Sequence, residues 1–135
     1  MTERIEKGVQ AYENYVCPHC WNTLDKCICD VFPPYHLIFI DKNIQEHIRL
    51  LNKKGYPTTG CCEGHMQTCI NTYIAFPNKF FEDKPLPSEF KYDKKRYMIS
   101  YTYSMKLSEE KFAEKKKQKL ADLLEWIKAL PQNEM

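Results

Sequence analysis

The chain has 135 residues, 43% hydrophobic and 28% charged, a composition typical of one globular domain with a modest core. Its formal net charge of +2 gives too weak a field to predict binding to nucleic acid or to an anionic membrane. The N-terminus is polar and no apolar run could cross a bilayer, so we expect no membrane association and a cytoplasmic protein with reduced thiols.

The chain begins with a short helix expected over residues 2–14, where apolar residues recur at helical spacing. A cysteine-rich segment follows and ends at two consecutive prolines, which hold the backbone extended. We therefore expect residues 1–34 to form an N-terminal helix and a zinc-binding loop. Residues 35–135 are expected to form the α+β part of one compact unit.

Four cysteines stand close together in that segment: Cys17, Cys20, Cys27 and Cys29. Zinc prefers four tetrahedral thiolate or imidazole ligands, and closely spaced cysteine pairs bring two sulfurs onto one ion. The segment is too polar to order itself by burial, so metal binding would supply the missing free energy. We predict structural Zn²⁺ on these four cysteines, with His19 or a cysteine from a later loop as an alternative for one ligand.

The tetrapeptide from Cys17 to Cys20 also matches the active site of oxidising thioredoxin-like enzymes. Such a dithiol lies where a strand passes into a helix, whose N-terminus lowers the pKa of the first thiol. Residues 12–16 are too short and polar for a central strand, and a redox helix has no use for a second cysteine pair. With seven cysteines, full pairing within the chain is also impossible, so the metal interpretation is favoured.

A continuous apolar run over residues 35–40 predicts a buried strand. A helix follows, capped by Asp41 or Asn43 and ended by Gly55. The next strand is expected to start near Tyr56. The helix between these two strands is long enough for a crossover, which is compatible with a parallel pairing.

The second half of the chain predicts strands over residues 72–76 and 96–104, separated by an irregular excursion over 77–90. Ser108 caps a long final helix, whose Lys119 is expected on the solvent side. The order predicts an α+β fold: a single small sheet of about four strands with two helices packed on one face. The expected core consists of Ile38, Ile40, Ile48, Leu51, Ile74, Ile99, Leu120, Leu123 and Ile127.

A second group of reactive residues lies in the loop 60–69: Cys61, Cys62, Glu63, His65 and Cys69. A metal site with an open position is one interpretation, with Cys62 and His65 as ligands and Glu63 as general base. A nucleophilic thiol–imidazole pair, a purely structural loop and a binding loop without chemistry stay open. A zinc deaminase is excluded, because its His-x-Glu signature precedes the cysteine pair whereas here the order is reversed.

Gly60 and Gly64 permit backbone turns in this loop that other residues cannot adopt, and they would let a ligand approach its backbone closely. If the loop is functional, we expect Cys62 and His65 to face a solvent-accessible pocket beside Glu63, with the Gly64 backbone open to a ligand. Residues 55–65 resemble the Gly-Tyr-x-Thr-x-x-(Ser/Cys)-Cys-x-Gly-His pattern of small bacterial and phage proteins. They are more distantly similar to the Ser-Cys-Ser-Gly-Arg motif of the wybutosine-synthesising tRNA methyltransferases, with His65 in place of the arginine. The resemblance implies a substrate-facing loop near a nucleotide or RNA.

Two hypotheses for function follow from these features. The first is a zinc-binding module that recognises nucleic acid or a protein partner through the loop 60–69. The second is an enzyme that uses Cys62 and His65, either on a second metal ion or as a thiol–imidazole pair.

Overall fold

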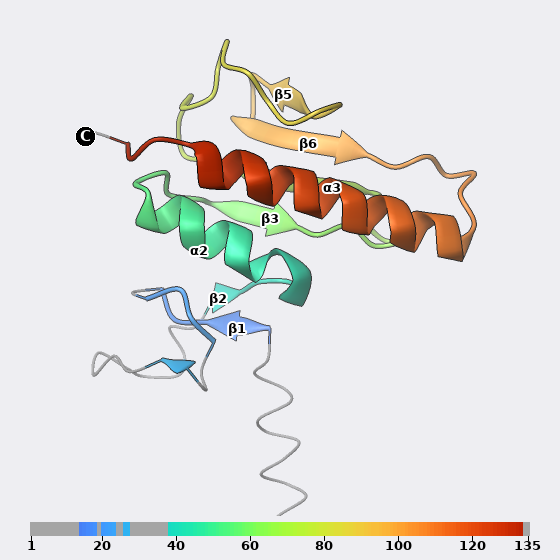
Figure 1. Cartoon of the computed structure of the whole chain (residues 1–135), viewed down its shortest axis with the longest axis horizontal. Coiled ribbons are helices and arrows are strands. Elements are labelled where there is room, and N and C mark those ends of the chain that lie inside the picture. Colours follow the sequence, from blue (N-terminus) through green and yellow to red (C-terminus); the bar gives the residue numbers. More distant parts are fainter. Residues whose placement is uncertain (1–13, 19, 24–25, 28–37, 134–135) are drawn as a thin grey trace, which may run out of the picture.

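Residues 14–18, 20–23, 26–27 and 38–133 are described in a computed structural model of the chain (Figure 1). The helix expected over residues 2–14 lies outside these ranges, apart from its last residue. Cys29 and His19 also lie outside the described residues.

The main sheet contains four antiparallel strands in the order β3-β4-β6-β5. The strands are β3 (Gly60–Cys62), β4 (Asn71–Ala75), β5 (Lys91–Asp93) and β6 (Met98–Thr102). Ile74 pairs with Ile99, and Thr72 pairs with Tyr101, so these side chains lie on one face of the sheet. The expected α+β fold class is confirmed.

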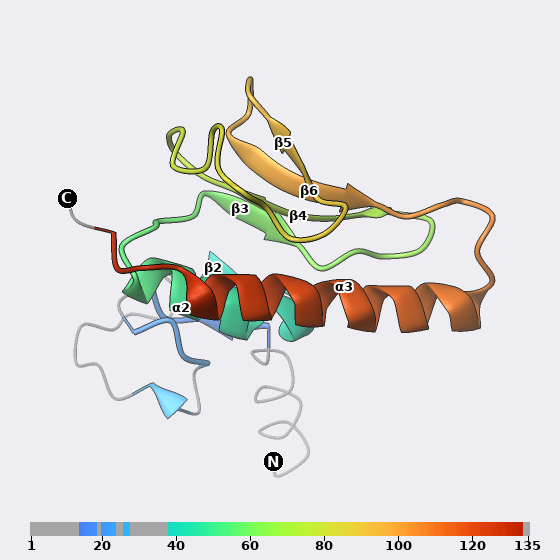
Figure 2. The same ribbon diagram turned by 45° about the horizontal axis from the view of Figure 1, so that its top comes forward.

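Two helices cover this face of the sheet and lie side by side (Figure 2). They are α2 (Gln45–Lys53), preceded by the short 3-10 turn η3 (Lys42–Ile44), and α3 (Glu109–Ala129). Of the residues expected in the core, all except Ile38 are buried. Within the described ranges, no helix combines the length and apolarity needed to cross a membrane.

A second, two-stranded sheet joins β1 (Tyr15–Val16) to β2 (Ile38–Phe39), so the expectation of a single sheet was wrong. Of the apolar run 35–40 predicted as a buried strand, residues 35–37 lie outside the described residues, and Ile38 and Phe39 pair with β1 instead of entering the main sheet. Ile38 is 39% exposed and Phe39 57%, and only Ile40 reaches the core. The Phe39 ring packs edge-on against Tyr15 across the strand pair. A short apolar run is consistent with a strand in the main sheet or in the two-stranded sheet, because its periodicity does not determine which strand it will pair with.

The strand expected near Tyr56 begins at Gly60, and it pairs antiparallel with β4 in a different sheet from β2. The structure also adds β5, which lies between the irregular segment 77–90 and the strand expected over 96–104. β5 and β6 form a hairpin whose turn is held by Asp93: its Oδ1 accepts hydrogen bonds from the backbone N of Lys95 and Arg96. A polar strand of three residues carries too little hydrophobic alternation to be recognised.

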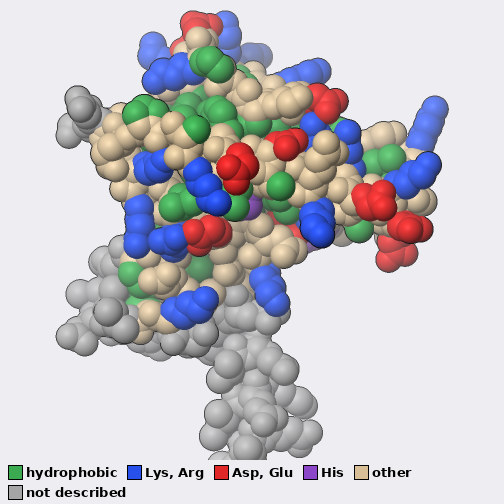
Figure 3. Space-filling model, in the orientation of Figure 1, with side chains coloured by type: hydrophobic (Ala, Val, Ile, Leu, Met, Phe, Trp, Pro, Cys, Tyr) green, Lys and Arg blue, Asp and Glu red, His purple; other side chains and the backbone are tan. Residues whose placement is uncertain are grey.

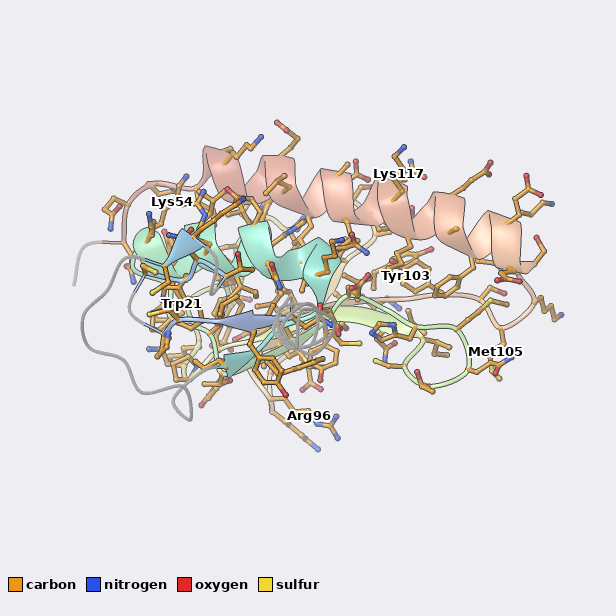
Figure 4. All side chains as sticks on the ribbon, turned by 90° about the horizontal axis from the view of Figure 1, so that it is seen from below. Trp21, Lys54, Arg96, Tyr103, Met105 and Lys117 are labelled. Carbon is orange, nitrogen blue, oxygen red and sulfur yellow. The ribbon has the colours of Figure 1, made fainter. Side chains whose placement is uncertain are left out.

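Two helix ends follow the sequence signals, and a third contact, made by Lys54, was not expected from the sequence. Ser108 caps α3 through its side chain, which accepts a hydrogen bond from Lys111 N. Gly55 ends the α2 segment with a φ of +89°, a conformation that glycine adopts without strain. Lys54 lies beside the C-terminal end of α3 (Figure 4), where its Nζ donates to the carbonyls of Ile127, Lys128 and Leu130.

Two candidate metal sites

Three of the four cysteines predicted as zinc ligands come together: the Sγ atoms of Cys17, Cys20 and Cys27 lie within 4.8 Å of one another. Sulfurs bound to one tetrahedral zinc at about 2.3 Å are separated by roughly 3.8 Å, so a small contraction would complete the site. Cys17 is buried, whereas Cys20 and Cys27 are half-buried. None of the described cysteines forms a disulfide.

A tight turn after β1 brings the first two thiols together. Cys17 N donates to Asn22 O at 2.9 Å, and Trp21 N donates to Cys17 O at 2.7 Å. Trp21 has a φ of +60°, in the left-handed region that residues other than glycine rarely occupy. Such backbone strain persists only where the surroundings hold it, and here it accompanies a cluster of thiols.

A second group of potential ligands lies where the C-terminal end of β3 meets the chain entering α2 (Figure 1). A carboxylate oxygen of Asp41, Sγ of Cys62 and a ring nitrogen of His65 lie within 4.8 Å of one another. His65 Nε2 is 3.0 Å from Asp41 Oδ2. Cys62 and His65 were expected at a functional site from the sequence, whereas Asp41 was expected only as a helix cap.

The capping prediction was wrong, because the loop 60–69 binds both expected caps. No side-chain hydrogen bond caps η3 or α2. Asp41 Oδ2 instead accepts a hydrogen bond from Glu63 N at 3.1 Å. Asn43 donates from its Nδ2 to Glu63 Oε2 at 2.8 Å. An Asp or Asn before a helix gives the same sequence pattern whether its side chain caps the helix or binds a distant loop.

Glu63 is buried, and its carboxylate pairs with Lys116 Nζ at 2.5 Å. Burial opposes ionisation, but the hydrogen bonds from Lys116 and Asn43 outweigh it, so the pKa of Glu63 is lowered. The carboxylate is thus an ionised partner of α3 and stands outside the Asp41–Cys62–His65 group. This arrangement does not fit the general-base role expected for Glu63.

Cys62 is 7% exposed, which contradicts the expected solvent-accessible thiol. Its Sγ accepts a weak hydrogen bond from Gly64 N at 3.4 Å and also interacts with the Cys69 thiol. Burial, together with the neighbouring Cys69, raises the pKa of Cys62 to about 12. In the metal-free protein the thiol is therefore protonated and a poor nucleophile.

Gly64 is closed to a ligand, contrary to expectation. Its φ is +100°, and a Cβ built there would lie 3.0 Å from Tyr103 Cε2 and 3.1 Å from Thr72 Oγ1. The glycine is required because the loop backbone packs directly on these two side chains. Tyr103 lies between α3 and the end of the sheet (Figure 4), so Gly64 joins the loop to the core.

His65 and Cys69 close the loop by exchanging backbone hydrogen bonds, His65 N to Cys69 O and Cys69 N to His65 O. His65 keeps an exposed side chain, with 43% of its surface accessible. Cys61 is placed differently: it packs against the hydrophobic core and belongs to neither ligand group. The loop thus presents one buried thiol and one exposed imidazole beside Asp41.

Comparisons with known protein families, curated proteins and solved structures found no match. Function must therefore be inferred from the residues themselves. Among the described residues, the two groups above are those in which three His, Cys, Asp or Glu ligand atoms converge. Both contain a buried cysteine and both could hold a metal ion.

Proposed function

We propose that this chain is a zinc-binding protein whose N-terminal segment is ordered by a structural zinc ion on Cys17, Cys20, Cys27 and Cys29. The convergence of three thiols within 4.8 Å, from a segment of short polar turns, is the observation that carries the proposal. Metal binding supplies the free energy that such a segment lacks. An all-thiolate tetrahedral set favours zinc over the hard cations Mg²⁺ and Ca²⁺.

Metal content of the chain purified under reducing conditions tests this proposal. Cys17→Ser, Cys20→Ser and Cys29→Ser should each lower the zinc content by one ion per chain. Cys61→Ser is the matched control, because Cys61 lies in neither ligand group, and it should keep the wild-type content. Full zinc retention in all three variants would exclude the assignment.

We further propose that the loop 60–69 is the surface through which the protein binds a partner. Its tip, residues 66–68, is exposed, and its base is fixed to the main body by Asp41 and Asn43. The loop 60–69 contains Glu63 and no Lys or Arg. On the face drawn in Figure 3, basic and acidic side chains are interspersed. A loop without basic side chains favours a protein over the phosphate backbone of a nucleic acid. The resemblance to the tRNA methyltransferase motif keeps RNA as the second candidate.

Titration with a fluorescent single-stranded RNA of mixed sequence separates the two kinds of partner. A protein-binding module should bind the RNA no better than the usual non-specific range, with a Kd of roughly 10⁻⁶ M or weaker at physiological salt. Tighter binding that Met66→Ala or Gln67→Ala abolishes would instead assign the loop to RNA.

The enzyme alternative rests on Cys62 and His65. A thiol–imidazole nucleophile needs an accessible, ionisable thiol bonded to the base. Cys62 is buried and interacts with Gly64 and Cys69, while the His65 imidazole contacts Asp41. These contacts favour the metal-bound form of the alternative over the thiol–imidazole pair.

A further inference from the structure

Three different ligand types meet at the junction between β3 and the chain entering α2. Asp41 offers a carboxylate oxygen, Cys62 a sulfur and His65 an imidazole nitrogen, all within 4.8 Å. Bond lengths of about 2.0–2.3 Å to one tetrahedral zinc require ligand separations of roughly 3.3–3.8 Å. Small side-chain movements from the present positions would satisfy that geometry.

We propose that Asp41, Cys62 and His65 form a second zinc site, separate from the N-terminal cysteine cluster and open at its fourth position. The proposal deepens the metal-bound alternative above by adding Asp41 to the ligands, and it is independent of the N-terminal zinc. It treats Glu63 as a support for the loop and not as a ligand.

The ligands are held in place before any ion binds. Glu63 N fixes the Asp41 carboxylate, and the backbone bonds between His65 and Cys69 fix the turn that carries the imidazole. Gly64 anchors the same turn on Tyr103. A preorganised ligand set loses little conformational entropy when the ion arrives.

The charges also suit a divalent ion. One carboxylate and one thiolate neutralise Zn²⁺, while the imidazole binds as a neutral ligand. Cys62 loses its thiol proton to solvent when the Zn–S bond forms. The site with its ion bound is therefore neutral overall. The charge of the nearby Glu63 is separately paired with Lys116, so it does not need the ion as a partner.

The burial pattern sets the direction of the fourth position. Cys62 lies on the inner side of the group, whereas the His65 side chain is 43% exposed and that of Asp41 15%. Three protein ligands with a solvent-facing fourth position are typical of zinc sites that bind a water molecule or a substrate, whereas structural sites are closed.

Cobalt titration of the metal-free, reduced chain tests the proposal, because a Co²⁺–thiolate bond gives a charge-transfer band. The wild type should bind two equivalents. The double variant Cys17→Ser/Cys20→Ser should keep one equivalent with thiolate charge transfer. Adding Cys62→Ser to the double variant should remove that band.

His65→Gln separates ligation from folding, because glutamine can still donate a hydrogen bond to Asp41. Its melting temperature without metal should match the wild type, while the second equivalent binds more than about 100-fold more weakly, beyond the 10–100-fold effect of an outer-shell change. Cys61→Ser should leave both equivalents intact.

Two equivalents retained in both His65→Gln and Cys62→Ser would overturn this second site. If the N-terminal cluster binds no metal, the cobalt titration gives a different result. The wild type and Cys17→Ser/Cys20→Ser would then each bind one equivalent, and His65→Gln would lose tight binding of that equivalent.

Discussion

Nε2 of His65 lies 3.0 Å from Oδ2 of Asp41, although 24 residues separate them in the sequence. The same carboxylate oxygen accepts the backbone hydrogen bond of Glu63. One aspartate therefore links the entry to α2 with both the backbone and the imidazole of the loop 60–69. The loop is consequently part of the folded body, even though it carries the residues most suited to chemistry.

Replacing Gly64 with alanine should detach this loop from the core. The new methyl group would lie 3.0 Å from the Tyr103 ring at a φ of +100°, so crowding and backbone strain act together. We expect a loss of about 1–3 kcal/mol in the free energy of unfolding, measured by urea denaturation. Gly60→Ala is the matched control, because nothing lies within 4 Å of its added Cβ. Equal stability of the two variants would contradict the packing role of Gly64.

Lys54 should be important for the end of α3. Its ammonium group donates to three carbonyls at the end of the helix, where backbone donors run out, although one of them, Ile127 O, also accepts a hydrogen bond from Leu130 N. Lys54→Met keeps the aliphatic stem and removes the donors, so we expect it to lower the free energy of unfolding by about 1–3 kcal/mol.

Lys53→Met is the control for this change, because Lys53 is exposed at the end of α2. Its effect should stay within about 0.5 kcal/mol. Hydrogen exchange should also become faster in residues 124–130 of the Lys54→Met variant. Unchanged exchange there would show that the last turn of α3 does not depend on the lysine.

The sequence was sufficient for features that depend on local periodicity. The apolar positions of α2 and α3 recur at helical spacing, and the core residues expected from them are buried. Ser108 and Gly55 mark helix ends through chemistry that involves only a few neighbouring residues. These signals are read without knowing the tertiary structure.

Features that depend on distant partners could not be predicted in this way. Asp41 satisfied a local capping pattern, but its side chain is used by a loop more than twenty residues away. Lys119 was expected in solvent; it is buried with its Nζ 4.7 Å from the centre of the Tyr101 ring and 2.5 Å from Glu89. The sequence around Lys119 is rich in lysines and does not indicate that this one side chain will contact an aromatic ring and a carboxylate from distant parts of the chain.

His47 should make stability depend on pH. The side chain is buried, its Nε2 lies 2.7 Å from Leu120 O, and its Nδ1 has no hydrogen-bond partner among the described residues. Burial lowers the pKa of His47, although Leu120 and Glu46 partly oppose the shift. The unfolded chain then binds more protons than the folded chain between the two pKa values. The contribution of His47 to the free energy of unfolding is therefore fully present above the unfolded pKa of about 6.5, and it is lost as the pH falls below that value.

Urea denaturation of the metal-free protein at pH 7.5 and 5.5 measures this effect. Between these two pH values, the free energy of unfolding of the wild type should fall by up to about 1.4 kcal/mol more than that of His47→Gln. Glutamine can still donate a hydrogen bond to Leu120 O, but it does not titrate. All other ionisable side chains are the same in both proteins, so their contributions cancel in the comparison. Identical losses would show that His47 is protonated as readily in the folded state as in the unfolded state.

Zinc removal should be visible in the fluorescence of Trp21. This residue directly follows Cys20, its backbone N donates to Cys17 O, and its side chain packs against the core. When a chelator removes the N-terminal zinc, the turn should open and the indole should become more exposed. In Trp126→Phe, where Trp21 is the only tryptophan, we expect a shift of the emission to longer wavelength that added zinc reverses.

Trp126 provides the internal control for this measurement. Its Nε1 donates a hydrogen bond to Pro85 O, its ring contacts the Phe81 ring, and it belongs to neither ligand group. In Trp21→Phe the emission should therefore not respond to the chelator. Adding Cys20→Ser to Trp126→Phe should abolish the response, because the turn can no longer close on the ion. If metal analysis confirms zinc loss while the Trp21 emission stays constant, the turn is stable without metal, and the N-terminal cluster does not order this segment.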